Sequence, residues 1–177
     1  MEQQAEQLLC MAENGDTEAQ ALVGNFCIIG KGGFPVDYER ALHYSVRAAE
    51  KGHPVAQTNM GQIYLRGLGV EKDREKAMGY LEKAMDQGFM KSFRYAGIYY
   101  AESGQFSTAA AFYEMGAQRG DITSQFLLGQ CYEDGVGVEQ NIEKAIHWYR
   151  ISARRGDEIA RPAMDALARL KDQEAIL

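Results

Sequence analysis

The sequence has few of the residues on which catalytic and metal chemistry usually depends. Among its 177 residues are only three histidines, three cysteines, three prolines and one tryptophan. The scarcity of proline, beside many Ala, Leu, Glu and Lys residues, favours helices over strands. Three cysteines, an odd number in unrelated contexts, fit a reduced compartment in which thiols act as small apolar core residues. A helical chain without a disulfide framework is therefore expected.

An excess of positive charge and long apolar runs are also missing. The net charge is -6, the pI is near 5.1 and no basic block appears, so binding to nucleic acid or an anionic membrane is not predicted. No apolar run approaches the roughly 18 residues of a membrane span. The polar start, MEQQAEQLLC, lacks the features of a secretory signal, which predicts a cytoplasmic protein. A periplasmic or secreted location stays open if the sequence is a piece of a longer chain.

What the sequence does contain is internal repetition. The stretch GLGVEKDREKA at 67–77 returns as GVGVEQNIEKA at 135–145, and more loosely as KGGFPVDYERA at 31–41. A glycine-rich loop followed by lysine can cradle phosphate. A ligand loop, however, is usually unique in a chain, whereas a connector recurs in every repeat. These glycines are therefore predicted to form structural turns.

Other residues recur with the same period. One glycine series has spacings of 37, 36, 32 and 36 residues: Gly15, Gly52, Gly88, Gly120 and Gly156. A second series lies nine residues after the first: Gly24, Gly61, Gly97 and Gly129. An alanine precedes each later member of the first series by eleven residues: Ala41, Ala77, Ala109 and Ala145. Constant spacing within four units predicts a repeat array.

Each unit is predicted to contain two helices. The first has small or apolar residues at i, i+4, i+7 and i+8, as in Ala56, Met60, Ile63 and Tyr64, which is typical of a helix with one buried face. The second is expected to start after an N-cap and to end at a left-handed glycine. The expected caps of the second helices are Asp37, Asp73 and Asn141, and those of the following first helices are Asp16, Asp121 and Asp157.

The glycine in the middle of each first helix needs a packing reason, because it costs about 1 kcal/mol relative to alanine. A missing side chain lets the neighbouring helix approach closely, and the recurrent alanine of the second helix is the expected partner. Gly61→Leu is therefore predicted to lower stability. Gly69→Ala, in a connector, is predicted to cost little unless the backbone there needs a positive φ.

The repeats resemble the Sel-one-like repeat, a branch of the tetratricopeptide-like helical solenoids. The resemblance is carried by AEKGHPVAQTNMGQIYLRGLGVEKDREKAMGYLEKAMDQG (49–88) and AQRGDITSQFLLGQCYEDGVGVEQNIEKAIHWYRISARRG (117–156). It implies an all-α, right-handed α-α superhelical solenoid of about ten helices. The implied single repeat domain has capping helices at 1–14 and 157–177 and repeats at 16–52, 53–88, 89–120 and 121–156. The third repeat departs from the pattern, because its connector, AESGQFSTA, is four residues shorter and lacks G-x-G-V.

No catalytic, cofactor or metal site is predicted. His43 and His147 occupy the same position of two repeats, and no histidine has a partner at metal-ligand spacing. A cysteine-rich, secreted branch of the family was linked to penicillin binding, which would suggest a Ser-x-x-Lys motif. No serine of this sequence has lysine three residues later, and the cysteines are not paired within repeats. A non-enzymatic protein is therefore expected.

By the same resemblance, the concave surface formed by the first helices is the expected binding groove. The positions that would line it are Asn25, Asn59, Gln62, Arg66, Lys91, Arg94, Tyr95, Phe126, Leu127 and Gln130. Its arginines and lysine form a basic group with Asn59, and Tyr95 and Phe126 are expected apolar anchors. In the alternative interpretation these are ordinary exposed polar residues, and Tyr95 packs sideways.

The leading hypothesis is thus a protein-interaction scaffold or adaptor that binds a protein or peptide, with an acidic segment as the specific hypothesis. A monomer is favoured over an oligomer. Two alternatives stay open: a hydrolase or β-lactam-binding activity of the kind suggested for the cysteine-rich branch, and a structural role in which solenoids stack end to end.

Overall fold

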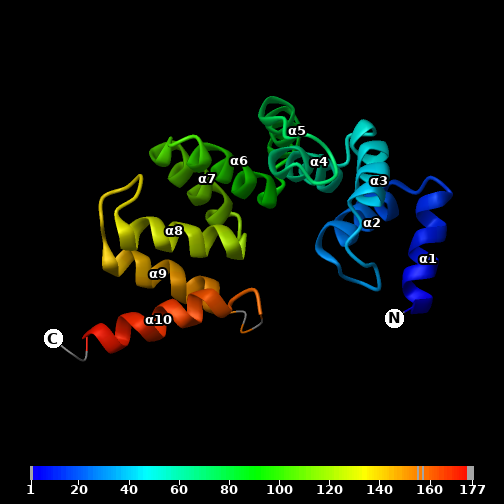
Figure 1. Cartoon of the computed structure of the whole chain (residues 1–177). Coiled ribbons are helices and arrows are strands. Elements are labelled where there is room, and N and C mark those ends of the chain that lie inside the picture. Colours follow the sequence, from blue (N-terminus) through cyan, green and yellow to red (C-terminus); the bar gives the residue numbers. More distant parts are fainter. Residues whose placement is uncertain (1, 155, 157, 175–177) are drawn as a thin grey trace. The chain divides into compact units, whose positions relative to one another are not determined.

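A computed structural model describes residues 2–154, 156 and 158–174, and within them the chain forms ten helices and no strand (Figure 1). The helices are α1 (Glu2–Glu13), α2 (Thr17–Ile29), α3 (Tyr38–Glu50), α4 (Pro54–Arg66), α5 (Arg74–Asp86), α6 (Met90–Glu102), α7 (Phe106–Gln118), α8 (Ile122–Asp134), α9 (Ile142–Ala153) and α10 (Arg161–Glu174). The predicted all-α repeat fold is confirmed. Positions 157 and 175–177 of the expected C-terminal capping helix lie outside the described residues, as do positions 1 and 155.

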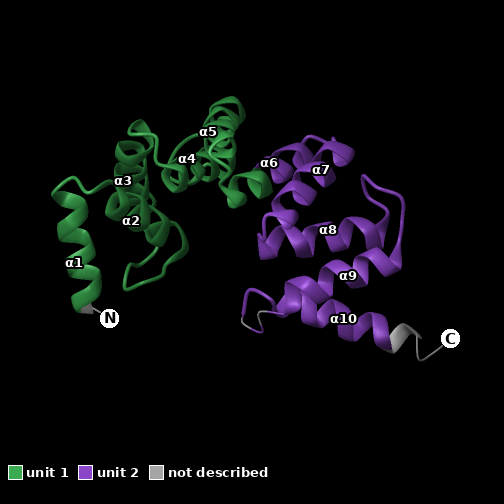
Figure 2. Cartoon of the chain, turned by 180° about the vertical axis from the view of Figure 1, so that it is seen from behind, with its two compact units in different colours: residues 1–95 green, residues 96–177 purple. Residues whose placement is uncertain are grey.

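The chain divides into two compact units, residues 1–95 and 96–177, with the boundary inside α6 (Figure 2). In unit 1, α2 packs on α3, α4 packs on α5, and α4 also contacts α2 and α3. In unit 2, α8 packs on α7 and α9, and α10 packs on α9. Each unit therefore repeats the same helix-pair contact. Buried apolar residues form a cluster on α1–α4 in unit 1, and in unit 2 they form one cluster on α7 and α8 and another on α9 and α10.

The predicted N-caps form at all five positions that the structure describes. Asp16, Asp37, Asp73, Asp121 and Asn141 each accept a hydrogen bond from the backbone N–H three residues later, at 2.7–2.9 Å. Such caps satisfy N–H groups that a helix start leaves without a partner. Asp157, the remaining expected cap, lies outside the described residues.

The glycines in the middle of the first helices are packing positions, as predicted. A Cβ atom added to Gly61 would lie 2.6 Å from the Leu81 side chain and 3.3 Å from the carbonyl oxygen of Ala77. The recurrent alanine takes part as expected at Gly24 and Gly61, but through its carbonyl oxygen and not its side chain. The side chain that covers each glycine is not the recurrent alanine but the residue four positions after it: Ser45, Leu81, Tyr113 and Tyr149 cover Gly24, Gly61, Gly97 and Gly129.

The connector glycines that resemble a phosphate loop pack against protein backbone. The φ angles of Gly69 and Gly137 are +70° and +77°, in the region that favours glycine. A Cβ added to Gly69 would lie 3.1 Å from the Cβ of Tyr38, and one added to Gly137 would overlap the carbonyl group of Phe106. Each connector thus rests on the start of the second helix of the preceding repeat. The backbone at Gly69 does have a positive φ, so Gly69→Ala is expected to lower the stability of the protein.

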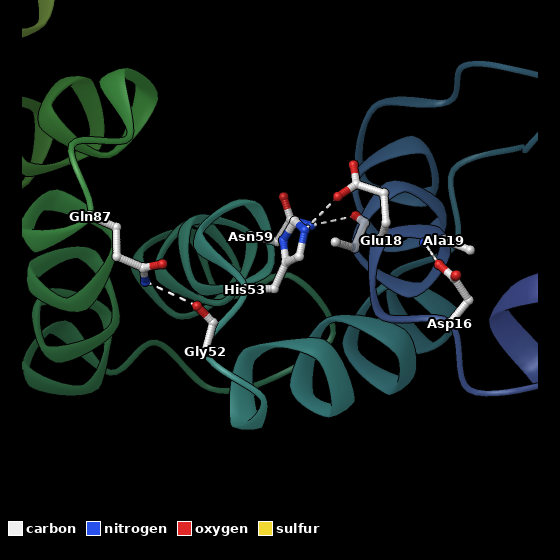
Figure 3. A network of polar contacts seen from close by, with 8 residues as sticks. Asp16, Glu18, Ala19, Gly52, His53, Asn59 and Gln87 are labelled. Atoms are coloured by element: carbon white, nitrogen blue, oxygen red, sulfur yellow. Dashed lines mark hydrogen bonds and ion pairs between the residues drawn. The ribbon is translucent and has the colours of Figure 1, made fainter.

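Polar contacts with the period of the repeat join successive helix pairs in unit 1 (Figure 3). The residue before a turn glycine donates to the carbonyl of the preceding turn glycine: Lys51 Nζ lies 2.9 Å from the Gly15 oxygen and Gln87 Nε2 lies 3.0 Å from the Gly52 oxygen. These carbonyls follow the C-terminal ends of helices, where backbone acceptors lack partners within the helix. The neighbouring repeat therefore supplies the missing donor.

In unit 2, the C-terminal helix α10 is attached to α8 by an ion pair. Arg169 donates to both oxygens of Glu133, at 2.6 and 3.0 Å, and the Tyr149 hydroxyl donates to Glu133 Oε2 at 2.7 Å. The Glu133 side chain is only 11% exposed. Burial raises the pKa of Glu133, but the hydrogen bonds and charge of Arg169 and the bond from Tyr149 outweigh burial, so the pKa lies below its ordinary value of 4.5.

Glu133→Gln should lower the free energy of unfolding at pH 7 by about 1–3 kcal/mol, because it removes the charge that both donors recognise. Since the folded-state pKa is depressed, this contribution is present above pH 4.5 and is lost as the pH falls through the folded-state value. Thermal melts of both proteins between pH 7 and pH 3 should show a gap that narrows below pH 4.5. A gap independent of pH would contradict the ion-pair assignment.

Candidate functional site

The residues expected to line a groove belong to both compact units. Within unit 1, Asn25 lies on α2, Asn59, Gln62 and Arg66 lie on α4, and Lys91, Arg94 and Tyr95 lie on α6. Within unit 2, Phe126, Leu127 and Gln130 lie on α8.

Asn59 is a core residue, which corrects the expectation that it lies exposed beside the basic residues. Its side chain is 2% exposed. Its Nδ2 donates to the Ala21 carbonyl at 3.1 Å and to Ser45 Oγ at 3.4 Å, and its Oδ1 accepts from Asn25 Nδ2 at 3.1 Å. A buried amide needs such partners. Asn59 therefore joins α4 to α2 and α3.

Gln62 and Tyr95 are also buried, at 5% and 8% exposure, so neither is an open groove residue. The Tyr95 hydroxyl donates to Gln62 Oε1 at 2.8 Å, which joins α6 to α4. The physical reason is the position of α4, which has helices packed on several sides. Residues 56–63 of this helix are all buried, including its polar ones. Tyr95 is consequently not the exposed apolar anchor that was expected.

The buried tyrosine instead supports two arginines. The guanidinium carbon of Arg94 lies 4.9 Å from the centre of the Tyr95 ring, and that of Arg66 lies 5.9 Å from it. Both distances fall in the range of cation–π contacts. Arg66 is exposed and Arg94 is half-buried. We call Arg66, Arg94 and Tyr95 the arginine–tyrosine cluster.

Lys91 adds a further cation near this cluster. It is exposed and lies three residues before Arg94 on α6, a spacing at which helical side chains share a face. Lys91 and Arg94 therefore share a face of α6, and Arg94 and Arg66 meet at Tyr95, in a chain whose net charge is -6. Guanidinium and ammonium groups in this arrangement can bind a carboxylate through charge-assisted hydrogen bonds.

The expected groove residues of unit 2 have different surroundings. The Phe126 ring lies 5.7 Å from the Tyr149 ring, and Phe126 packs half-buried against the core cluster of α9 and α10. Gln130 is exposed, and together with Leu127 it lines a cavity of about 230 Å³. Phe126 is thus partly a core residue, whereas Gln130 faces a cavity.

The sequence pattern of the Sel1 repeat family matches residues 17–53, 54–89 and 122–157, which is more than half of the chain. The chain belongs to the Sel1 repeat family. The matched ranges leave out residues 90–121, where the connector between helices is short. The resemblance read from the repeated glycines and alanines is confirmed.

Three similar proteins illustrate the range of this family. DAP3-binding cell death enhancer 1 of Rattus norvegicus is 32% identical over 78% of this chain and 35% of its own length. The ERAD-associated E3 ubiquitin-protein ligase component HRD3B of Arabidopsis thaliana is 32% identical over 55% of this chain and 16% of its own. The crystal structure of a Sel1 repeat protein from Oxalobacter formigenes is 29% identical, with a TM-score of 0.62 over 94% of this chain and 49% of that one. The chain thus spans about a third of the rat relative.

A buried glutamine recurs in the first helix of three Sel1 repeats and was not predicted from the sequence. Gln20, Gln57 and Gln125 each lie four residues before a mid-helix glycine, and all three are buried. Gln20 Nε2 donates to the Ala12 carbonyl at 3.0 Å, and Gln125 Nε2 donates to the Ala117 carbonyl at 3.2 Å. The signal that could have found them is their constant offset from the glycine series. Gln20 and Gln125 thus satisfy carbonyl groups near the end of the preceding helix, whereas Gln57 Oε1 accepts from Gln87 Nε2 at 2.8 Å.

Over the part of the Sel1 repeat chain that the structure describes, no three or more His, Cys, Asp or Glu side chains are grouped to hold a metal ion. Nor does any helix among these described residues have the length and apolar character needed to cross a membrane. The feature that stands out chemically in unit 1 is the arginine–tyrosine cluster.

Proposed function

We propose that this Sel1 repeat protein is a non-catalytic adaptor that binds an acidic segment of a partner protein at the arginine–tyrosine cluster. Family membership supports the interaction role, since repeat solenoids present extended surfaces for binding. The names of the relatives point the same way: one is called DAP3-binding and another a component of a ubiquitin ligase. The role of this chain follows by analogy with them.

The single observation that carries the proposal is the placement of Arg66 and Arg94 over one tyrosine ring. The ring is held by its hydrogen bond to Gln62, and the contacts with the ring restrict both guanidinium groups. Side chains ordered before binding lose less entropy when a ligand arrives. An Asp or Glu side chain, or a C-terminal carboxylate, could then accept hydrogen bonds from both arginines.

Charge also favours an acidic partner segment at this place. Arg66, Lys91 and Arg94 bring positive charge together on a chain with an overall negative charge, so an acidic segment is attracted at this place. Exposed charges are screened within about 8–10 Å at physiological ionic strength. Binding at the arginine–tyrosine cluster should therefore weaken as salt rises.

The experiment is affinity capture of a partner, followed by affinity measurements on the captured partner between 50 and 500 mM NaCl. The variant Arg66→Glu, Arg94→Glu should lower the affinity at low salt by about tenfold or more, because it replaces two attractions by two repulsions. The melting temperature should shift by only a few degrees, since exposed cation–π contacts are worth about 0.5–1 kcal/mol.

A matched control is the variant Arg47→Glu, Arg150→Glu, which changes the net charge equally at two exposed helix positions outside the cluster. It should keep the affinity within about twofold of the unsubstituted protein, because neither arginine belongs to the arginine–tyrosine cluster. If both double variants bind the partner equally well, the arginine–tyrosine cluster is not the binding site. If both lose binding to the same extent, net charge rather than the cluster determines affinity.

A further inference from the structure

Unit 2 contains an apolar cavity of about 230 Å³ whose role is not explained by the helix pairs themselves. Its apolar wall comes from the end of α6, from α7 and α8, and from the connector that follows α8. The wall includes Ala101, Phe106, Tyr113, Leu127, Cys131 and Val136. Phe106 and Val136 are 49% and 41% exposed, so large apolar groups contact solvent at this cavity. We call it the α7–α8 cavity.

The short third connector contributes no apolar side chain to the surface at the end of α6 and the start of α7. The other three connectors each place an apolar side chain against a core: Phe34 is 5% exposed, and Val70 and Val138 are partly buried against core clusters. Between α6 and α7 the chain has only residues 103–105, Ser-Gly-Gln, and all three are exposed. The third connector therefore leaves the neighbouring apolar surface uncovered, and the connector side chain that reaches the cavity is Val136 from the connector after α8.

Negative charge borders this cavity. Asp134 and Gln130 belong to its lining, and both are exposed. Burial, together with a smaller contribution from the Asp134 carboxylate, raises the pKa of Cys131 to about 11. Burial, with smaller contributions from Cys131 and from the Glu102 carboxylate, raises the pKa of Tyr113 to about 12. Two carboxylates thus lie near enough to act on groups of the cavity wall.

We infer that the α7–α8 cavity binds an apolar side chain of a partner segment that carries lysine or arginine beside that side chain. A cavity of roughly 150 Å³ can hold benzene, and drug-sized ligands occupy roughly 300–1,000 Å³. The cavity therefore suits one leucine or phenylalanine side chain better than a larger ligand. Asp134 at the rim favours a cation next to the inserted group.

This inference goes beyond the proposed function, because it concerns another unit and the opposite charge. The arginine–tyrosine cluster of unit 1 suits an acidic segment, whereas the α7–α8 cavity of unit 2 suits a basic segment with an apolar anchor. A partner with both kinds of segment could be held at two places, which raises the overall affinity through effective concentration. Each site can still be tested without the other.

The test uses the full chain labelled with ¹⁵N and two seven-residue peptides with a central leucine, one flanked by lysines and one by glutamates. In amide-shift titrations at low salt, the lysine peptide should give saturable shifts in residues 101–113 and 127–136. Its affinity there should exceed that of the glutamate peptide by about threefold or more, the effect of an exposed ion pair. Shifts of the glutamate peptide near Arg66 and Arg94 would report on the unit 1 site alone.

Two variants and a control test the geometry. Ala101→Leu should fill the cavity and weaken the lysine peptide by about tenfold or more, while Asp134→Asn should remove most of its advantage over the glutamate peptide. Ala111→Leu adds the same side chain at an exposed position of α7 and should leave both affinities unchanged. The amide spectra themselves show whether each variant is folded. If Ala101→Leu does not fold, the binding measured with Asp134→Asn decides the test.

Three outcomes would overturn the inference. One is the absence of saturable shifts around the α7–α8 cavity with either peptide. Another is equal affinity of the lysine and glutamate peptides at this place. The third is unchanged binding of the lysine peptide by a folded Ala101→Leu protein.

Discussion

Replacing Gly61 by leucine should lower the melting temperature of the protein by about 5–10 °C. Even a single added carbon at this position would lie 2.6 Å from the Leu81 side chain, and a leucine adds three more. The α4–α5 contact would have to open, at a cost of about 1–3 kcal/mol or more for overpacking. For a chain of this size each kcal/mol corresponds to about 2–4 °C.

Gly79 provides the matched control for this prediction. It also lies within a helix, α5, but a Cβ added there would meet no atom within 4 Å. Gly79→Ala should therefore raise the melting temperature by about 2–3 °C, because alanine is the better helix former by about 1 kcal/mol. Thermal melts followed by circular dichroism would compare the variants. An unchanged midpoint for Gly61→Leu would remove the packing argument for the whole glycine series.

The second large effect is expected at a connector. Gly137→Ala should lower the free energy of unfolding by about 3 kcal/mol or more. The left-handed backbone, with φ at +77°, costs an alanine about 1–2 kcal/mol. The added carbon would also overlap the Phe106 carbonyl, so the backbone of the connector or of α7 must move. Urea unfolding monitored by circular dichroism would measure the loss.

Gly104→Ala separates these two causes. Gly104 has a φ of +73°, but a Cβ added there would have no neighbour within 4 Å. Its substitution should cost only the backbone term of about 1–2 kcal/mol. Equal losses for Gly104→Ala and Gly137→Ala would mean that the contact between the connector and α7 contributes nothing.

These packing positions matter for the two proposed sites as well. Gly61 lets α4 approach α5 closely, and α4 carries Gln62 and Arg66 of the unit 1 site. Gly137 follows Val136, which lines the α7–α8 cavity. Because the same close contacts position both sites, stability should be measured beside binding for every variant near them.

The sequence by itself predicted the helix pairs, because their signals are local. An aspartate or asparagine cap acts on a backbone N–H group three residues away, as at Asp37 and Asp73. A left-handed glycine ends a helix through its own backbone freedom, as at Gly52. Repetition strengthened these signals, since each was present in several units, and it also identified the mid-helix glycines as contacts.

Only the tertiary structure decided which polar residues are accessible. Asn59 and Gln62 have side chains typical of a helix surface, yet both are buried, because helices from neighbouring repeats cover α4 on the sides where they point. Tyr95 likewise lies buried beneath two arginines, with its hydroxyl bonded to Gln62 of another helix. Burial depends on contacts between residues about 30 positions apart, which a local helical period does not encode. The short third connector was visible in the sequence, but the cavity beside it depends on how α7, α8 and the next connector pack in space.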